Sequence, residues 1–248
     1  MNFIESTNFF VRTIMFDFVN ANPDIKLKFR VAPMIHIGSE EYYQMVVEKI
    51  KDCDEIFYEG LYLIDKKEKP YKKISLKNFE LFYRNYQIVA DKLGLVRQYN
   101  SMDLSELKDK LTHTDFNPKT GAKAWQQVTL KEKIKHSLIE PIQQYIYFSY
   151  GITRERLAKL FMTSYEEAYL AFGPVEDEPG TSENFIMNQR EQIIFQNIKN
   201  RMDSESHLDK TIGIIYGAGH MKSIARYLID RYHFVPRNGQ FLKVFDVV

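Results

Sequence analysis

The sequence has little of several features that would place it in a specialised class of protein. It contains one cysteine, Cys53, which excludes an intramolecular disulfide and fits a reducing compartment. Charge nearly cancels, with 34 Lys and Arg against 33 Asp and Glu, which disfavours binding of nucleic acid through bulk electrostatics. No apolar run reaches the roughly 18 residues of a membrane span. These absences favour a soluble protein that binds no nucleic acid.

The first twenty residues do not have the pattern of an export signal. They are rich in phenylalanine, but Arg12 and Asp17 interrupt the apolar run, and no small-residue cleavage site follows. We therefore expect a cytoplasmic protein with no membrane span. Nothing in the sequence specifies an oligomeric state.

What the sequence contains is enough for one large domain. Of its 248 residues, 44% are hydrophobic and 27% are charged, a composition typical of globular proteins. The order of predicted elements indicates an α/β fold, with a central mixed or mainly parallel sheet flanked by helices. We expect its core to come from residues of about 25–100 and 183–248, with a helical insertion over about 101–182.

The first regular unit is predicted as strand, helix and strand. Lys28–Ile37 has the pattern of a strand, although Pro33 lacks an N–H for a central ladder and indicates an edge, a bulge or a distorted strand end. Ser39 is a suitable N-cap for the following amphipathic helix, and Asp54–Gly60 is the second strand. A helix that connects two strands predicts that they are parallel.

A second unit, Thr211–Arg226, carries the most distinctive motif of the chain. An apolar run rich in isoleucine is followed by Gly217-Ala218-Gly219, then by His220 and a helical pattern. Glycine tolerates backbone angles that other residues resist, so a tight turn is predicted here. We expect this turn to expose His220 at the start of the helix, where its truncation would cost under about 1 kcal/mol.

Three candidate site residues lie at the ends of three predicted strands: His36, Glu59 and His220. Because parallel strands end at one edge of a sheet, we expect these side chains on one side of a single cleft. Two imidazoles and a carboxylate suit zinc, manganese or cobalt. They could equally act without metal, with one histidine as general base and Glu59 orienting it. The purely structural alternative is a set of polar strand ends, with Glu59 paired to an arginine.

A further candidate, Arg190, lies in a predicted helix over Glu183–Met202. It could form a surface salt bridge or clamp a carboxylate or oxyanion at the catalytic edge. Near the chain's middle, His113–Gly121 is rich in turn residues, and we expect His113 and Asp115 to lie in a solvated loop.

Other predicted elements complete the chain. They are a helical stretch over Thr129–Tyr150 with a kink at Pro141, a helix from Thr153 to Phe172, an acidic linking loop at Pro174–Ser182, and a strand at Gln240–Val248 that joins the sheet.

Together these motifs resemble the TraB/PrgY/GumN superfamily, which includes the Tiki proteases and is related to erythromycin-esterase-like and haem-binding ChaN-like proteins. That family has two GxxH motifs and an acidic residue at the end of the second strand. Gly217–His220 matches the second motif, and Glu59 matches the acidic residue. The first motif is matched by PMIH, with Pro33 where the family has glycine. Arg190 and the segment Leu93–Gln98 resemble the family's arginine and central strand.

The resemblance implies a peptidase-like hydrolase that acts on a peptide or small-molecule substrate. It implies a divalent metal (manganese, cobalt or zinc) or an activated water held by His36, Glu59 and His220. Arg190 would then stabilise developing negative charge, and Gly217 and Gly219 are assigned to substrate binding. The helical insertion would select the substrate. The competing class is a non-catalytic protein on the same scaffold, either a peptide-signal regulator or a haem- or metal-binding protein.

Overall fold

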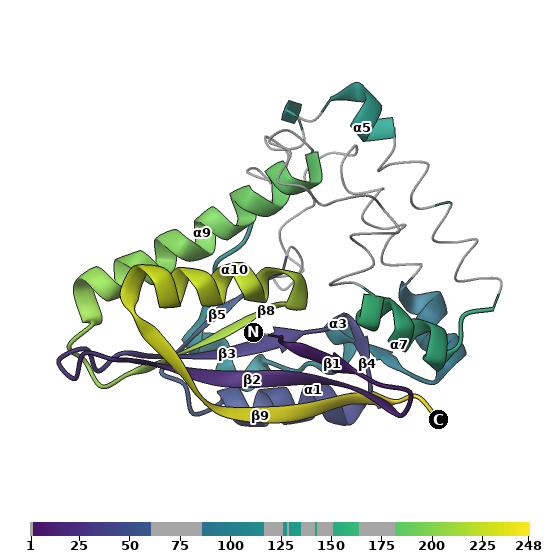
Figure 1. The fold of residues 1–248 in the computed structure, drawn as a ribbon, viewed down its shortest axis with the longest axis horizontal. Coiled ribbons are helices and arrows are strands. Elements are labelled where there is room, and N and C mark those ends of the chain that lie inside the picture. The colour runs from purple at the N-terminus through teal and green to yellow at the C-terminus, as the bar shows by residue number, and fades with distance from the viewer. Residues whose placement is uncertain are drawn as a thin grey trace.

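The computed structural model describes residues 2–60, 86–116, 126–127, 129–134, 142, 151–163 and 182–248. Strands and helices are interspersed along these residues, with four strands before the first helix and helices between the later strands (Figure 1). The strands are β1 (Ile4–Ser6), β2 (Phe10–Asn20), β3 (Lys28–Met34), β4 (Ile37–Gly38), β5 (Glu55–Tyr58), β6 (Val96–Arg97), β7 (Leu111–His113), β8 (Thr211–Gly217) and β9 (Phe234–Asp246). The helices are α1 (Glu40–Ile50), α3 (Gln98–Ser101), α5 (Leu130–Ile134), α7 (Arg154–Thr163), α9 (Ser182–Glu205) and α10 (Met221–Arg226).

The central sheet is mixed, with its parallel strands grouped together. Its order is β1-β2-β3-β8-β5-β7, and β9 pairs with the other edge of β2. Strands β3, β8, β5 and β7 are parallel, whereas β2 is antiparallel to its neighbours. The predicted α/β class is therefore confirmed. Four parallel strands end at one edge of this sheet, and the candidate site is built there.

The N-terminal segment belongs to the sheet, although the predicted core began only near residue 25. Its burial alternates along β2, where Val11, Thr13 and Met15 point into the core. Of the two charged residues that interrupt the apolar run, Arg12 lies on the other face and pairs with Glu5. Asp17 lies on the same face as Met15 and pairs with its cross-strand neighbour Arg30. Alternation of this kind is what a strand with one buried face requires.

Four other expectations about the strands have different outcomes. Pro33 lies where predicted, at a strand end, because β2 pairs with β3 only as far as Val31. The assignment of Leu93–Gln98 to a central strand is wrong, since β6 pairs with β4 in a separate two-stranded sheet. The predicted insertion also contains β7, which is a strand of the main sheet. The strand predicted at Gln240–Val248 is confirmed as the end of β9.

Only parts of the predicted middle helices are described. Helix α5 and helix α7 lie within the ranges predicted as helical. The kink at Pro141 and the acidic loop from residue 174 to 181 lie outside the described residues. In the part of the chain that is described, no helix is both long enough and apolar enough to cross a membrane.

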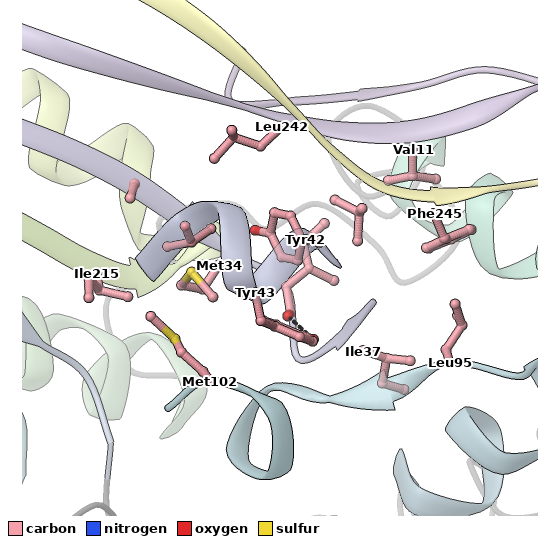
Figure 2. Packing of buried hydrophobic residues seen from close by; sticks show 14 of the residues in the cluster. Val11, Met34, Ile37, Tyr42, Tyr43, Leu95, Met102, Ile215, Leu242 and Phe245 are labelled. Atoms are coloured by element: carbon pink, nitrogen blue, oxygen red, sulfur yellow. Dashed lines mark hydrogen bonds between the residues drawn. The ribbon is translucent and has the colours of Figure 1, made fainter. Parts of the chain in front are cut away.

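The sheet buries a separate hydrophobic core on each face. Alternate residues of β3 and β8 point to opposite sides, so that Val31 and Ile214 pack with α9 and α10, whereas Met34 and Ile215 pack with α1. Figure 2 shows Met34 and Ile215 in the core beneath α1, together with the two tyrosines of that helix. The helices on the two faces hold the parallel strands in a fixed position at their carboxyl ends.

Helix α1 holds the end of β3 by two buried tyrosine hydroxyls. Tyr42 donates to the carbonyl oxygen of Pro33 at 2.8 Å. Tyr43 donates to that of Ile35 at 2.9 Å, the bond drawn as a dashed line beside Tyr43 in Figure 2. Burial raises the pKa of both tyrosines, so both stay neutral donors. The predicted cap is also confirmed, because Ser39 Oγ accepts from the backbone N–H of Tyr42. These bonds fix the backbone that leads to His36.

Helix α9 is attached to the sheet by Glu55 at the start of β5. Arg201 donates to both carboxylate oxygens of Glu55, at 2.7 and 2.8 Å, and the hydroxyl of Thr112 donates to one of them. Burial raises the pKa of Glu55, but these bonds outweigh burial and bring it below its usual value. The ionised form of Glu55 therefore stabilises the fold.

This attachment predicts a specific dependence of stability on pH. A carboxyl group with a lowered pKa contributes stability above its unfolded pKa, here about 4.5, and loses that contribution as pH falls through the folded value. Glu55→Gln should lower the free energy of unfolding by about 1 kcal/mol at neutral pH, and by progressively less at acid pH. Urea titrations across this pH range measure the difference, with Glu48→Gln in an exposed ion pair as the control. A difference that does not change with pH would contradict the assignment.

Candidate functional site

The candidate site lies where β5, β7 and β8 end beneath the first half of α9. Glu59 follows β5 directly, Asp115 lies two residues beyond β7, and Gly217 is the last residue of β8. Arg190 and Glu191 reach these strand ends from α9. We call this set of residues, completed by His220, the edge cluster.

Arg190 joins two of the strands by clamping two carboxylates. Its Nε and Nη2 donate to the two oxygens of Asp115, both at 2.8 Å, and Nη2 also donates to Oε1 of Glu59. The Asp115 side chain is fully buried, and Arg190 is only 20% exposed. The surface salt bridge expected as one alternative for Arg190 is wrong, because its ion pairs are buried. The pair with Glu59 is the purely structural alternative expected for that residue, and a clamp for a carboxylate or oxyanion at the catalytic edge stays a prediction. The two carboxylates raise the pKa of Arg190 against the opposing effect of burial.

The prediction of a solvated loop around His113 and Asp115 is wrong. His113 is the last residue of β7, and its Nε2 lies 2.7 Å from the carbonyl oxygen of Gly60. Thr114 and Asp115 are buried, and the hydroxyl of Tyr216 donates to Thr114. The parallel pairing of β7 with β5 extends to His113, so this residue belongs to the sheet. The residues rich in turn formers come later in the sequence.

Glu59 is a buried carboxylate that its surroundings keep ionised. Burial raises its pKa, but the charge of Arg190 opposes this most strongly, followed by those of His220 and His36. The backbone N–H of Gly217 also donates to Oε2 of Glu59. The result is a pKa below the usual value, so the cluster holds a fixed negative charge at neutral pH.

His220 is buried, which corrects the prediction that it is exposed. Only 3% of the side chain is accessible. Residues Ala218–His220 form a short 3₁₀ turn between β8 and α10, and this turn directs the imidazole back towards α9. There Nδ1 lies 3.2 Å from Oε1 of Glu191, and Nε2 lies 3.7 Å from Oε1 of Glu59. The ring of Tyr216 meets that of His220 edge-on.

The geometry of His220 separates its two nitrogens. The donor in the contact with Glu191 depends on the tautomer of His220, and with an ionised Glu191, which can only accept, Nδ1 carries the proton. In the neutral ring, Nε2 then carries the lone pair. Nε2 makes no hydrogen bond with the described residues, yet it is not among their fully buried polar atoms. It is therefore the nitrogen of His220 that has no hydrogen-bond partner among the described residues.

The glycines of the turn act differently from the prediction. Neither Gly217 nor Gly219 has a positive φ, so left-handed geometry is not the reason for them. Gly217 is needed because a Cβ there would lie 3.0 Å from Oε2 of Glu59. The absence of a side chain lets the Glu59 carboxylate approach the backbone N–H.

This close approach predicts the effect of adding one methyl group. Gly217→Ala should displace the Glu59 carboxylate and lower the free energy of unfolding by about 1–2 kcal/mol, because the new Cβ is too close to a buried charged group. Gly219→Ala, in the same turn at an exposed position, should cost under about 0.5 kcal/mol. Chemical denaturation of the two variants compares them directly. Equal costs would mean that the contact with Glu59 does not explain Gly217.

His36 lies at the same edge but outside the contacts of the edge cluster. Its side chain is exposed, its Nδ1 lies 3.1 Å from Oε1 of Gln98, and its ring is 5.7 Å from that of Tyr86. It is still close enough for its charge to lower the pKa of Glu59. The structure thus brings Glu59 and His220 together and leaves His36 beside them.

In this arrangement the predicted metal ligands do not form a complete site. Oε1 of Glu59, the oxygen nearest to His220, is already bound by Arg190, so a cation there would have to compete with the guanidinium. His36 is turned to Gln98. Within the residues that the structure describes, no three His, Cys, Asp or Glu side chains form a group suited to a metal ion. The metal remains a prediction that needs a binding measurement.

Two members of the edge cluster, Asp115 and Glu191, were missed as site residues. Glu191 could have been found, because it continues the buried stripe of α9 at helical spacing with Ile194, Ile198 and Met202. A carboxylate in line with an apolar stripe is a signal of a buried polar partner. No comparable signal marks Asp115, since β7 is only three residues long.

Comparison with protein-family models, curated proteins and solved structures gives no match for this chain. The resemblance to the TraB/PrgY/GumN superfamily therefore stays a prediction from short motifs. The geometry of the edge cluster is the basis of the function proposed below.

Proposed function

We propose that the chain is a peptidase-like hydrolase in which His220 activates water. The observation that carries this proposal is the pairing of the two nitrogens of His220 with two different carboxylates, Glu191 at 3.2 Å and Glu59 at 3.7 Å. Because Glu59 is beyond hydrogen-bond length, Nε2 is the nitrogen left to act as a base, while Nδ1 is bound to Glu191.

The proposed reaction uses only groups of the edge cluster. Nε2 of His220 accepts a proton from water, and the water oxygen forms a bond to the carbonyl carbon of the substrate. The imidazolium that results is stabilised by the negative charges of Glu59 and Glu191. When the bond to the leaving nitrogen breaks, Nε2 returns the proton to that nitrogen.

Arg190 supports this chemistry through the groups that it holds. Its Nε and Nη2 are occupied by Asp115 and Glu59, whereas Nη1 has no acceptor among the described residues. A fixed guanidinium next to the base is suited to stabilise negative charge that develops on a substrate oxygen. We assign Arg190 this role, together with that of keeping Glu59 ionised.

A divalent metal belongs to the proposal as an alternative way of activating water. His220 and Glu59 would hold the ion with His36, after Arg190 had released Oε1 of Glu59 and His36 had turned from Gln98. When bound, manganese, cobalt or zinc would lower the pKa of a water ligand. Calorimetric titration with each metal tests this, and His36→Ala should remove any binding while His207→Ala, at an exposed position, should not.

The activity itself is tested with a mixture of peptides and a set of simple esters and amides, with mass spectrometry of the products. We expect the wild type to hydrolyse part of this panel, and His220→Ala to lose the activity while His207→Ala retains it. A folded wild type that cleaves nothing, with or without added metal, would overturn the hydrolase. Metal or haem binding without hydrolysis would favour the non-catalytic alternative.

A further inference from the structure

We propose that Glu191 is a positioning residue that fixes the tautomer of His220, with the proton on Nδ1 and the lone pair on Nε2. The role of Glu191 in the reaction rests on the proposed hydrolase. The position of the proton on His220 rests only on the contacts of that side chain.

The first support is the position of Glu191 on α9. It directly follows Arg190, and successive residues on a helix point about 100° apart. The two neighbours therefore contact residues that follow different strands. Arg190 binds Glu59 after β5 and Asp115 after β7, and Glu191 binds His220 after β8. The same turn of α9 thus holds both functional groups of the edge cluster.

The second support is the burial of Glu191. A buried carboxylate needs a partner, and Glu191 is only 8% exposed. Its Oε1 is 3.2 Å from Nδ1 of His220, which is the one hydrogen-bond partner of Glu191 in the part of the chain that the structure describes. The hydrogen bond between Glu191 and His220 therefore satisfies a buried polar group on each side chain.

The third support is the asymmetry of the two carboxylates around the ring. Glu59 already accepts from Arg190 on Oε1 and from Gly217 on Oε2, and at 3.7 Å it is beyond hydrogen-bond length from Nε2. Glu191 is within hydrogen-bond length of Nδ1. The proton is consequently drawn to Nδ1, and Nε2 faces the fixed charge of Glu59.

The tautomer is measured by two-bond nitrogen–proton correlation NMR on the full chain with ¹⁵N-labelled histidine. The signals of His220 are identified by their loss in His220→Asn. Spectra are taken about two pH units above the usual histidine pKa of about 6.5. We expect a neutral ring with the proton on Nδ1 in the wild type. A proton on Nε2, or a doubly protonated ring, would overturn the proposal without any need for a variant.

Glu191→Gln then tests the cause. We expect this variant to lose the strict Nδ1–H form, and its kcat to fall about 10- to 100-fold at little changed KM, as for other outer partners of functional histidines. Glu191→Asp should recover part of both effects. Glu205→Gln, the same change farther along α9 at a residue paired with Lys210, should alter neither.

The two proposals fail in different ways. If the tautomer of the wild type survives both in Glu191→Gln, whose amide oxygen can still accept from Nδ1, and in Glu191→Leu, which has no acceptor, the positioning role is wrong even if the protein is a hydrolase. If the tautomer changes as expected but no substrate is cleaved by any form, the positioning of the proton stands and the hydrolase is wrong.

Discussion

Arg190→Met is expected to lower the free energy of unfolding by about 3–5 kcal/mol at neutral pH, the largest loss of any single change described above. The variant leaves Glu59 and the fully buried Asp115 without their shared cation. Removing one partner of a buried ion pair is costly because the remaining charges are neither hydrated nor paired. Guanidinium titrations measure the loss.

Arg201→Met is the matched control for this prediction. Arg201 lies on the same helix and binds the carboxylate of Glu55 through two nitrogens, but it is 31% exposed. Water can partly replace the lost contact, so the expected cost is about 1 kcal/mol. A cost for Arg190→Met as small as that of the control would show that the edge cluster is hydrated.

A combined variant separates lost attraction from unpaired charge. Arg190→Met with Glu59→Gln and Asp115→Asn removes the cation and both anions, so no isolated charge remains in the interior. Much of the lost stability should return, because the largest part of the cost arises from the unpaired carboxylates. If the combined variant is less stable than Arg190→Met alone, that explanation is wrong.

His220→Ala should produce the second large effect, and should change both stability and activity. A buried ring with a hydrogen bond to Glu191 is lost, and that carboxylate is left without its partner. We expect a cost of about 1–3 kcal/mol in the free energy of unfolding, more than an exposed histidine would give. Loss of a general base should also lower kcat by about 10²- to 10⁴-fold. Thermal melts and the hydrolysis assay measure the two effects.

The double variant Glu191→Gln/His220→Ala tests whether the two side chains act as a pair. Coupled neighbours give effects that do not add, so the double variant should be less destabilised than the sum of the two single changes. His207→Ala, at an exposed site, should change neither quantity. Additive costs, or full activity in His220→Ala, would remove His220 from the proposed mechanism.

The sequence by itself determined the α/β class and the shared edge of the candidate site. The pattern of strand, helix and strand requires parallel strands, and parallel strands end together. Glu59 and the glycine turn before His220 were therefore predicted at one edge, and Glu59 lies in contact with both Gly217 and His220. Arg190 was predicted on a helix, with a carboxylate clamp as one of two alternatives. These features depend on local periodicity, which a sequence displays directly.

Only the tertiary structure decided which groups meet and how deeply they are buried. Arg190 contacts Glu59 across 131 positions and Asp115 across 75, and no local pattern encodes such pairings. The exposure predicted for His220 was wrong because it depends on α9, which folds over the turn and supplies Glu191. His36 is turned to Gln98 for the same reason, since β6 and α3 pack against the loop after β3. Burial and side-chain partners come from elements distant in the chain, and these set the chemistry of the edge cluster.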